Sequence, residues 1–208
     1  MKLWSPFKNL KADQSYDNMY EYFLHDDFTA ATKEGQKILK QEPEHEKTLL
    51  LLGQIALMKR QRSRARARYH KILWTNASSS EARLGRGDAS FGKKDYEAAL
   101  EDYLTLYETA RKNFPYMQKL GSVYAALGLD HIALRYFQKA VDLASSDMEA
   151  QFALIRHLIR LRHYKEADTH VKTAKDIYYH HKSSLAPHVL EEIKKLETQV
   201  RSSLHKKK

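Results

Sequence analysis

The chain has 208 residues and a formal net charge of +10 at pH 7, which favours anionic partners without choosing among them. It contains no cysteine, and this excludes disulfides and thiolate metal sites. Its seven glycines and four prolines are few, as in a helical protein with short connections. Because no apolar run is long enough for a signal peptide or a membrane span, we expect a soluble, cytoplasmic protein with no transmembrane segment.

The first 11 residues form a short amphipathic segment in which Leu3, Trp4, Phe7 and Leu10 alternate with lysines. A proline after a serine, as in Ser5-Pro6, favours the start of a helix. Three interpretations remain open for residues 1–11. They form a cap on the first repeat, a segment that docks on a partner or a membrane surface, or a disordered end.

Beyond this segment the chain repeats with a period of 34 residues. An alanine recurs at this spacing, at Ala31, Ala65, Ala99, Ala133 and Ala167. Four residues after each alanine stand Gly35, Tyr69, Tyr103, Phe137 and Val171, and seven residues after it stand Ile38, Ile72, Leu106, Ala140 and Ala174. Twelve residues before it stand Met19, Gly53, Gly87, Gly121 and Ile155. A period of this length predicts stacked helix–turn–helix units.

The repeat divides residues 12–181 into five contiguous units, 12–45, 46–79, 80–113, 114–147 and 148–181. Apolar residues in each unit follow helical spacing, so each unit is expected to contain two helices that bury their stripes against neighbouring units. Asp95 and Asp130 are expected to cap the second helices of the third and fourth units.

The segment Leu120-Gly121-Ser122-Val123-Tyr124, followed by Ala133, Phe137 and Ala140, resembles the tetratricopeptide repeat (TPR) pattern. Residues 96–103 resemble the second helix of that pattern. The resemblance implies an all-α fold, a right-handed superhelical array of antiparallel helix pairs known as an alpha-solenoid. It also implies that the first helix of each pair lines the concave side. The end units depart from the pattern at Met19, Gly35 and Ile155.

Residues 182–204 are expected to form a helix that caps the last repeat. Pro187 suits a first helical turn. An apolar stripe follows it, formed by Val189, Leu190, Ile193, Leu196 and Val200. Residues 205–208 form a basic tail.

The family register predicts which side chains face the concave groove. They are Tyr16, Tyr20, Phe23, Leu24, Leu50, Gln54, Leu57, Met58, Leu84, Asp88, Phe91, Gln118, Ser122, Phe152, Arg156 and Arg160. Those of the first three units are mostly apolar or aromatic, which is typical of a binding surface. The alternative is that some of them pack against the N-terminal segment or against one another.

One known ligand of TPR arrays is not expected here. Arrays that bind the C-terminal carboxylate of heat-shock chaperones carry Lys, Asn and Arg at set positions of three first helices. The corresponding residues here are Tyr16, Tyr20, Leu51, Glu81 and Gly85, and the registers shifted by one or two units give no cationic clamp either. A chaperone-tail carboxylate clamp is therefore improbable.

A basic stripe covers residues 59–71 and includes Arg60, Arg62, Arg64, Arg66, Arg68 and Lys71. One interpretation pairs these cations with Glu97, Glu101, Asp102 and Glu108 of the next unit. The others are an acidic protein partner or nucleic-acid phosphates, although the stripe lacks the interleaved aromatic residues that stack on bases.

The eleven histidines show no shared helix face that would hold a metal, and no catalytic arrangement or phosphate loop stands out. We therefore expect no enzyme, no cofactor and no metal. The favoured function is a protein–protein interaction scaffold or adaptor that binds an extended or helical partner segment in its groove. The alternative is a nucleic-acid or anionic-surface binder that uses the basic stripe, and weak self-association stays open.

Overall fold

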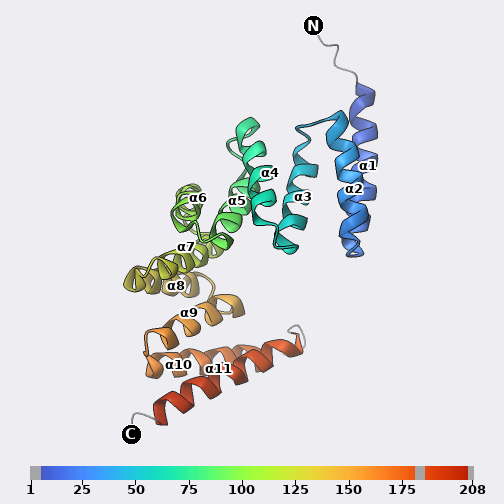
Figure 1. Ribbon diagram of the computed structural model, residues 1–208. Helices are drawn as coiled ribbons and strands as arrows, with labels where there is room; N and C mark the ends of the chain where they lie inside the picture. Colours follow the sequence, from blue (N-terminus) through green and yellow to red (C-terminus); the bar gives the residue numbers. More distant parts are fainter. Residues whose placement is uncertain (1–5, 181–185, 206–208) are drawn as a thin grey trace. The chain divides into compact units, whose positions relative to one another are not determined.

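The computed structural model describes residues 6–180 and 186–205, with the side chains of residues 6–13 excepted. Over these residues it contains eleven α-helices and no strand (Figure 1). The helices are α1 (Pro6–Leu24), α2 (Phe28–Gln41), α3 (Glu46–Met58), α4 (Arg62–Thr75), α5 (Ser80–Gly92), α6 (Tyr96–Thr109), α7 (Phe114–Ala126), α8 (Asp130–Leu143), α9 (Met148–Arg160), α10 (Tyr164–His180) and α11 (Pro187–His205). The expected all-α fold of paired helices is confirmed.

The 34-residue period of the sequence sets the helix boundaries. The first helices α3, α5, α7 and α9 begin at Glu46, Ser80, Phe114 and Met148, each 34 residues after the last. The N-terminal part differs, because α1 is one continuous helix from Pro6 to Leu24 and no break occurs at residue 11. Leu3 and Trp4 of the N-terminal amphipathic segment lie outside the described residues, as do the side chains of Phe7 and Leu10 and residues 206–208.

Helix starts are fixed by side-chain caps at several of these boundaries. Asp27, Ser79, Asn113 and Asp147 each accept a hydrogen bond from the backbone N–H three residues later, at the starts of α2, α5, α7 and α9. The expected capping role of Asp130 is wrong. Asp130 is itself the first residue of α8, and its carboxylate instead forms an ion pair with Arg160.

A second period appears in the turn between the two helices of each unit. The backbone has a positive φ, between 56° and 77°, at Asp26, Arg60, Lys94, Gly128 and Arg162. These five positions are also 34 residues apart, and only one of them is a glycine. Since L-residues with a side chain rarely adopt this left-handed conformation, four of the turns carry a local conformational cost.

The positions that define the repeat form the core. All five recurring alanines are fully buried. In the three middle units an aromatic ring from the second helix lies against a glycine of the first helix. A Cβ atom added to Gly53, Gly87 or Gly121 would lie within 2.8 Å of an atom of Tyr69, Tyr103 or Phe137, respectively. The glycine is therefore needed for space rather than for backbone freedom.

The first repeat, 12–45, also packs a large residue against a glycine, but the two helices exchange these roles. Its first helix supplies the large residue, Met19, and its second helix supplies the glycine, Gly35. A Cβ added to Gly35 would lie 3.0 Å from both the Sδ and the Cε atoms of Met19. In the fifth unit two medium-sized residues, Ile155 and Val171, are buried in one core cluster.

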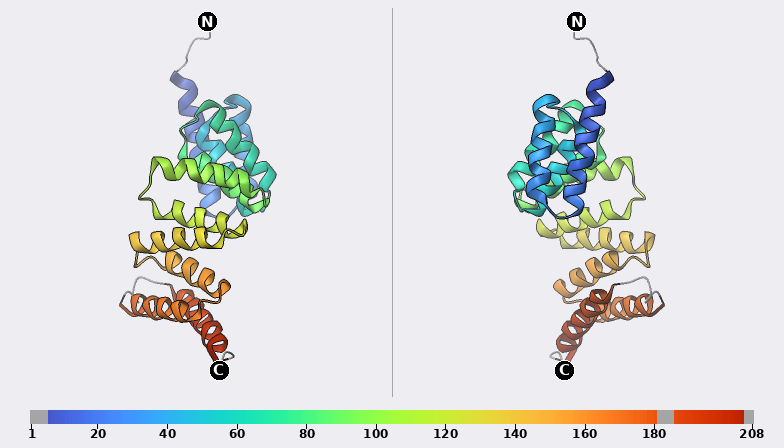
Figure 2. Two further views of the ribbon diagram at one scale, coloured as in Figure 1. Left: turned by 90° about the vertical axis from the view of Figure 1, so that its left-hand side faces the viewer. Right: turned by 90° about the vertical axis from the view of Figure 1, so that its right-hand side faces the viewer.

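The helices fall into two compact units, each larger than one repeat. We call them unit 1 (Met1–Leu106) and unit 2 (Tyr107–Lys208). In unit 1, α1 contacts α2 and α3, and α3 contacts α4 and α5; the right-hand view of Figure 2 shows α1 and α2 side by side. The second helices α2 and α4 make no comparable contact among the described residues. The first helices therefore form a continuous layer, and the second helices are spread apart behind it.

In unit 2, α7 contacts α9, and α9 contacts α11. Thus α11 takes the place that the first helix of another pair would occupy. Its stripe residues Val189, Ile193, Leu196 and Val200 are buried. Glu197 of α11 binds Lys175 of α10, with oxygen–nitrogen distances of 2.9 and 3.1 Å.

Candidate functional site

The layer of first helices in unit 1 exposes several large apolar side chains. Tyr20 and Leu24 of α1 are 43% and 56% exposed, and Met58 of α3 is 52% exposed. Tyr16, Phe23, Leu50, Leu57, Leu84, Asp88 and Phe91 are half-buried, and Gln54 is exposed. These helices contact one another, so the predicted groove residues of unit 1 lie on adjoining helices.

Aromatic rings form a row along α1. The ring centroids of Tyr16 and Tyr20 are 6.3 Å apart, and those of Tyr20 and Phe23 are 6.1 Å apart. Phe23 also contacts Phe28, the first residue of α2. Partial burial raises the pKa of the Tyr16 hydroxyl, and Tyr20 and Asp17 add to this effect.

The carboxylate of Asp88 is hydrogen-bonded to a buried side chain of the core. The Tyr103 hydroxyl donates a hydrogen bond of 2.6 Å to Asp88 Oδ1. Burial, together with the charge of Asp88, raises the pKa of Tyr103, so this hydroxyl stays protonated and donates at neutral pH. The position of the Asp88 carboxylate is therefore fixed by a core residue of the same repeat.

The predicted residues of unit 2 have a different environment. Ser122, Arg156 and Arg160 line one cavity of about 280 Å³ together with His157. Both arginines are bound to acids of the chain, because Arg156 Nη2 lies 2.9 Å from Glu192 Oε1 and Arg160 pairs with Asp130. Phe152 is buried in the core. Gln118 is half-buried, and its amide nitrogen has no hydrogen-bond partner among the described residues.

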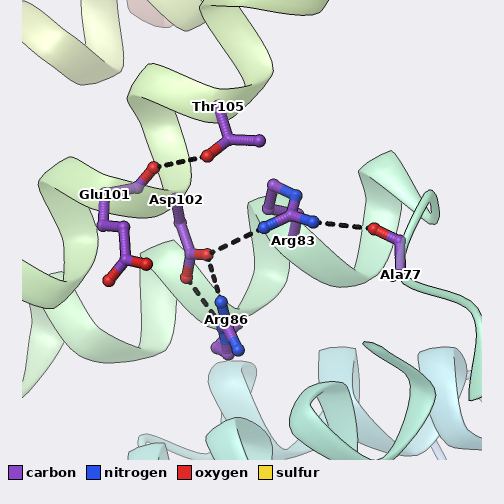
Figure 3. Close-up of polar contacts among 6 residues, drawn as sticks. All are labelled: Ala77, Arg83, Arg86, Glu101, Asp102 and Thr105. Carbon is purple, nitrogen blue, oxygen red and sulfur yellow. Dashed lines mark hydrogen bonds and ion pairs between the residues drawn. The ribbon is translucent and has the colours of Figure 1, made fainter. Parts of the chain in front are cut away.

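One interpretation of the sequence paired the basic stripe with a set of acidic residues that includes Asp102. The structure pairs Asp102 with other residues. Its buried carboxylate binds two arginines of α5 (Figure 3). Arg86 donates to it from Nε at 2.9 Å and from Nη2 at 2.6 Å, and Arg83 Nη1 lies 3.7 Å away. The pairing is thus between the two helices of one repeat.

The basic stripe is divided among several environments. Arg66 forms an ion pair with Asp95 at 2.7 Å, and Arg68 donates to the backbone oxygen of Leu52 at 2.7 Å. Arg60 lies in the turn before α4, and Arg62 packs against Gly92. Within the described residues Arg60, Arg62, Arg64 and Lys71 have no carboxylate partner.

Sequence analysis missed an aromatic residue on this helix. Trp74 is 84% exposed and lies three residues after Lys71, on the same face of α4. The basic stripe of residues 59–71 ends three residues before Trp74, so this ring was not counted among its aromatic residues. The signal was present in the sequence, because Trp74 falls outside the positions that recur with the buried framework.

Among the described residues no group of three acidic residues and histidines is placed to hold a metal. His157 and His170 have structural partners instead. His157 Nε2 lies 3.0 Å from the backbone oxygen of Asp130, and His170 Nδ1 lies 3.1 Å from Gln151 Oε1. None of the described helices has the length and apolar character needed to cross a membrane.

A family model described as tetratricopeptide repeat matches residues 50–116. MamA from Desulfovibrio magneticus RS-1 (residues 41 to the end) has a similar fold, with a TM-score of 0.71 and 17% identity over 85% of this chain and 98% of that one. A thermophilic TPR protein of Thermus thermophilus, TTC0263, gives a TM-score of 0.67 and 17% identity over 93% and 98%. YrrB, described as a TPR protein with an unusual peptide-binding site, gives 0.57 and 22% over 83% and 97%.

No curated protein matches the chain significantly. The evidence for its family is therefore the sequence repeat, the match of the family model and the shared fold. The 34-residue period sets both the helix boundaries and the buried framework, and solved TPR structures share the arrangement of helices. Residues 50–116 match the tetratricopeptide repeat family, and the chain has the fold of a TPR array.

Proposed function

We propose that the protein is an interaction scaffold that binds an apolar segment of a partner protein on the first-helix layer of unit 1. The observation that carries this proposal is the exposure of Tyr20, Leu24 and Met58 on helices that contact one another. Large apolar side chains grouped on a surface are typical of protein-binding sites. The peptide-binding site named for YrrB supports it further, since that protein has the same fold.

The aromatic row on α1 suits an amphipathic helix or an extended segment with spaced apolar anchors. Tyr16, Tyr20 and Phe23 lie at helical spacing, so an apolar stripe on a partner would meet successive rings. Lys47 lies 6.0 Å from the Tyr16 ring centroid and adds a cation at the edge of this row. Arg156 and Arg160 are not part of this proposed site, because acids of unit 2 already bind them.

The test is a selection of peptides from a displayed random library on the full chain, followed by titration of the selected peptides. Leu24→Glu/Met58→Glu removes two exposed anchors of the proposed site. Leu129→Glu/Leu143→Glu is the matched control, because these leucines of unit 2 are 40% and 48% exposed. We expect the first pair to weaken binding at least tenfold and the control to change it less than twofold, with unchanged circular dichroism for both.

Peptides that bind the Leu24→Glu/Met58→Glu variant as tightly as the unaltered chain would place the binding surface elsewhere. Leu57 and Phe91 are less suitable positions for this test. Leu57 packs against the core of α3–α5, and the Phe91 ring lies 5.5 Å from the Tyr96 ring, so a charge there would disturb the fold as well.

A further inference from the structure

A cationic pocket lies on the other side of unit 1, between the second helices α2 and α4. Its volume is about 470 Å³. It is lined by Thr29, Thr32, Lys33, Gln36, Ile55, Ala56, Lys59, Gln61, Arg64 and Arg68. None of these is a proposed partner-binding residue. Lys59, Gln61, Arg64 and Arg68 lie within the basic stripe of residues 59–71, whereas Lys33 lies outside it. We call this site the α2–α4 pocket.

The lining contains four cations and no carboxylate. Lys33 lies on α2 in the preceding repeat, and Lys59 lies at the end of α3 in the same repeat as α4, so two successive repeats together build this charge. No ion pair joins Lys33, Lys59, Arg64 or Arg68 to an acidic residue in the part of the chain that the structure describes. The pocket is thus a concave site with a strongly positive potential.

Three of the four cations are held in place by neighbours that are not acids. Arg68 donates from Nη1 to the backbone oxygen of Leu52 at 2.7 Å, and Arg64 donates from Nη1 to Gln61 Oε1 at 3.2 Å. Lys59 Nζ lies 5.8 Å from the centroid of the Phe28 ring. These contacts orient the cations and leave their charge uncompensated, which is favourable for binding an anion.

The cations also repel one another. The pKa of Arg68 is lowered, first by burial and then by the positive charge of Arg64. An anion between them would offset this repulsion and compensate Arg68 for its lost hydration. The planar guanidinium groups of Arg64 and Arg68 suit the oxygen atoms of a phosphate group, which they can bind through paired hydrogen bonds.

The number of charges indicates the size of the ligand. A single phosphate monoester carries about 1.5 to 2 negative charges at neutral pH. It would leave about two of the four cations unbalanced, whereas two phosphate groups carry about 3 to 4 negative charges and come closer to balancing all four. The pocket lining has no aromatic ring on which a base could stack. We propose that the α2–α4 pocket binds a small anion with two or more linked phosphate groups.

Isothermal titration of the full chain with sodium pyrophosphate at low salt tests this proposal. Lys33→Glu/Lys59→Glu reverses two exposed cations of the pocket. The matched control is Lys40→Glu/Lys71→Glu, which makes the same change of charge on exposed lysines of α2 and α4 outside the pocket. We expect one site per chain, at least tenfold weaker binding by the first variant and less than threefold weaker binding by the control.

Three results of this titration would overturn the proposal. These are the absence of saturable binding, equal weakening by the two double variants, and orthophosphate binding as tight as pyrophosphate binding. A parallel titration with a single-stranded RNA 12-mer separates the remaining source of phosphate groups. RNA binding without pyrophosphate binding would make the surface a nucleic-acid site and end the proposal. Thermal unfolding of both variants without ligand checks that the fold is intact.

Discussion

The carboxylate of Asp102 in α6 accepts two hydrogen bonds from the guanidinium group of Arg86 in α5, although Asp102 is almost fully buried. A buried charge is stable only while its partner compensates it. We therefore expect Arg86→Met to lower the free energy of unfolding by about 3 kcal/mol, measured by urea denaturation. Arg83, at 3.7 Å, is too far away to replace the two lost hydrogen bonds.

The control is the double variant Arg86→Met/Asp102→Leu, which removes both charges. No buried carboxylate is then left without a partner, and the half-buried Arg83 still donates to the backbone oxygen of Ala77, so the double variant should be more stable than Arg86→Met alone. A double variant that is as unstable as the single one would mean that Arg86 stabilises the protein mainly through packing.

The ring of Tyr69 in α4 fills the space left by two glycines, Gly53 of α3 and Gly85 of α5. A Cβ atom on Gly85 would overlap the Cζ atom of Tyr69. We expect Gly85→Ala to destabilise the protein by about 1–3 kcal/mol through overpacking, measured by urea denaturation. Adding Tyr69→Leu should recover part of this loss, and a neutral Gly85→Ala would mean that the ring can move aside.

Much of this fold could be predicted because the buried positions repeat. Ala99, Tyr103 and Leu106 are buried as their spacing indicates, and the 34-residue period places the helices. The exchange of Met19 and Gly35 could not be predicted from one position at a time. It follows from the combined volume of two side chains on two helices, which the sequence does not pair.

The candidate site was harder to predict. A register gives the face of a helix but not the reach of a long side chain. Arg156 was expected at the end of the groove, yet it binds Glu192, which is 36 residues away on α11. The α2–α4 pocket could not be predicted for the same reason, since Lys33 lies one repeat before the dense run of arginines and reaches the pocket from α2.

The turn at Gly128 isolates the effect of backbone conformation. Its φ is +77°, and a Cβ atom there would have no neighbour within 4 Å in the part of the chain that the structure describes, apart from the adjacent residues. Gly128→Ala should therefore lower the free energy of unfolding by about 1 kcal/mol through the left-handed conformation alone. Asparagine tolerates this conformation better than alanine, so Gly128→Asn should cost less. Equal losses for the two variants in urea denaturation would contradict a backbone cause.

Two histidines of unit 2 should make the stability of the protein depend on pH. The pKa values of His157 and His170 are both lowered, mainly by burial, relative to an ordinary value of 6.5. As the pH falls below 6.5, these histidines take up protons in the unfolded chain before they do so in the folded one. Protonation then favours unfolding, so these two groups cause no loss of stability above pH 6.5 and a growing loss below it.

We therefore expect the free energy of unfolding to decrease between pH 7.5 and pH 5.5, as measured by urea denaturation at fixed ionic strength. His170→Gln should make this decrease smaller, because glutamine does not titrate and still offers an amide donor to Gln151 Oε1. Exposed His131 gives the matched variant His131→Gln, which should leave the pH dependence as it is. If the two variants change the dependence equally, the burial of His170 is not its source.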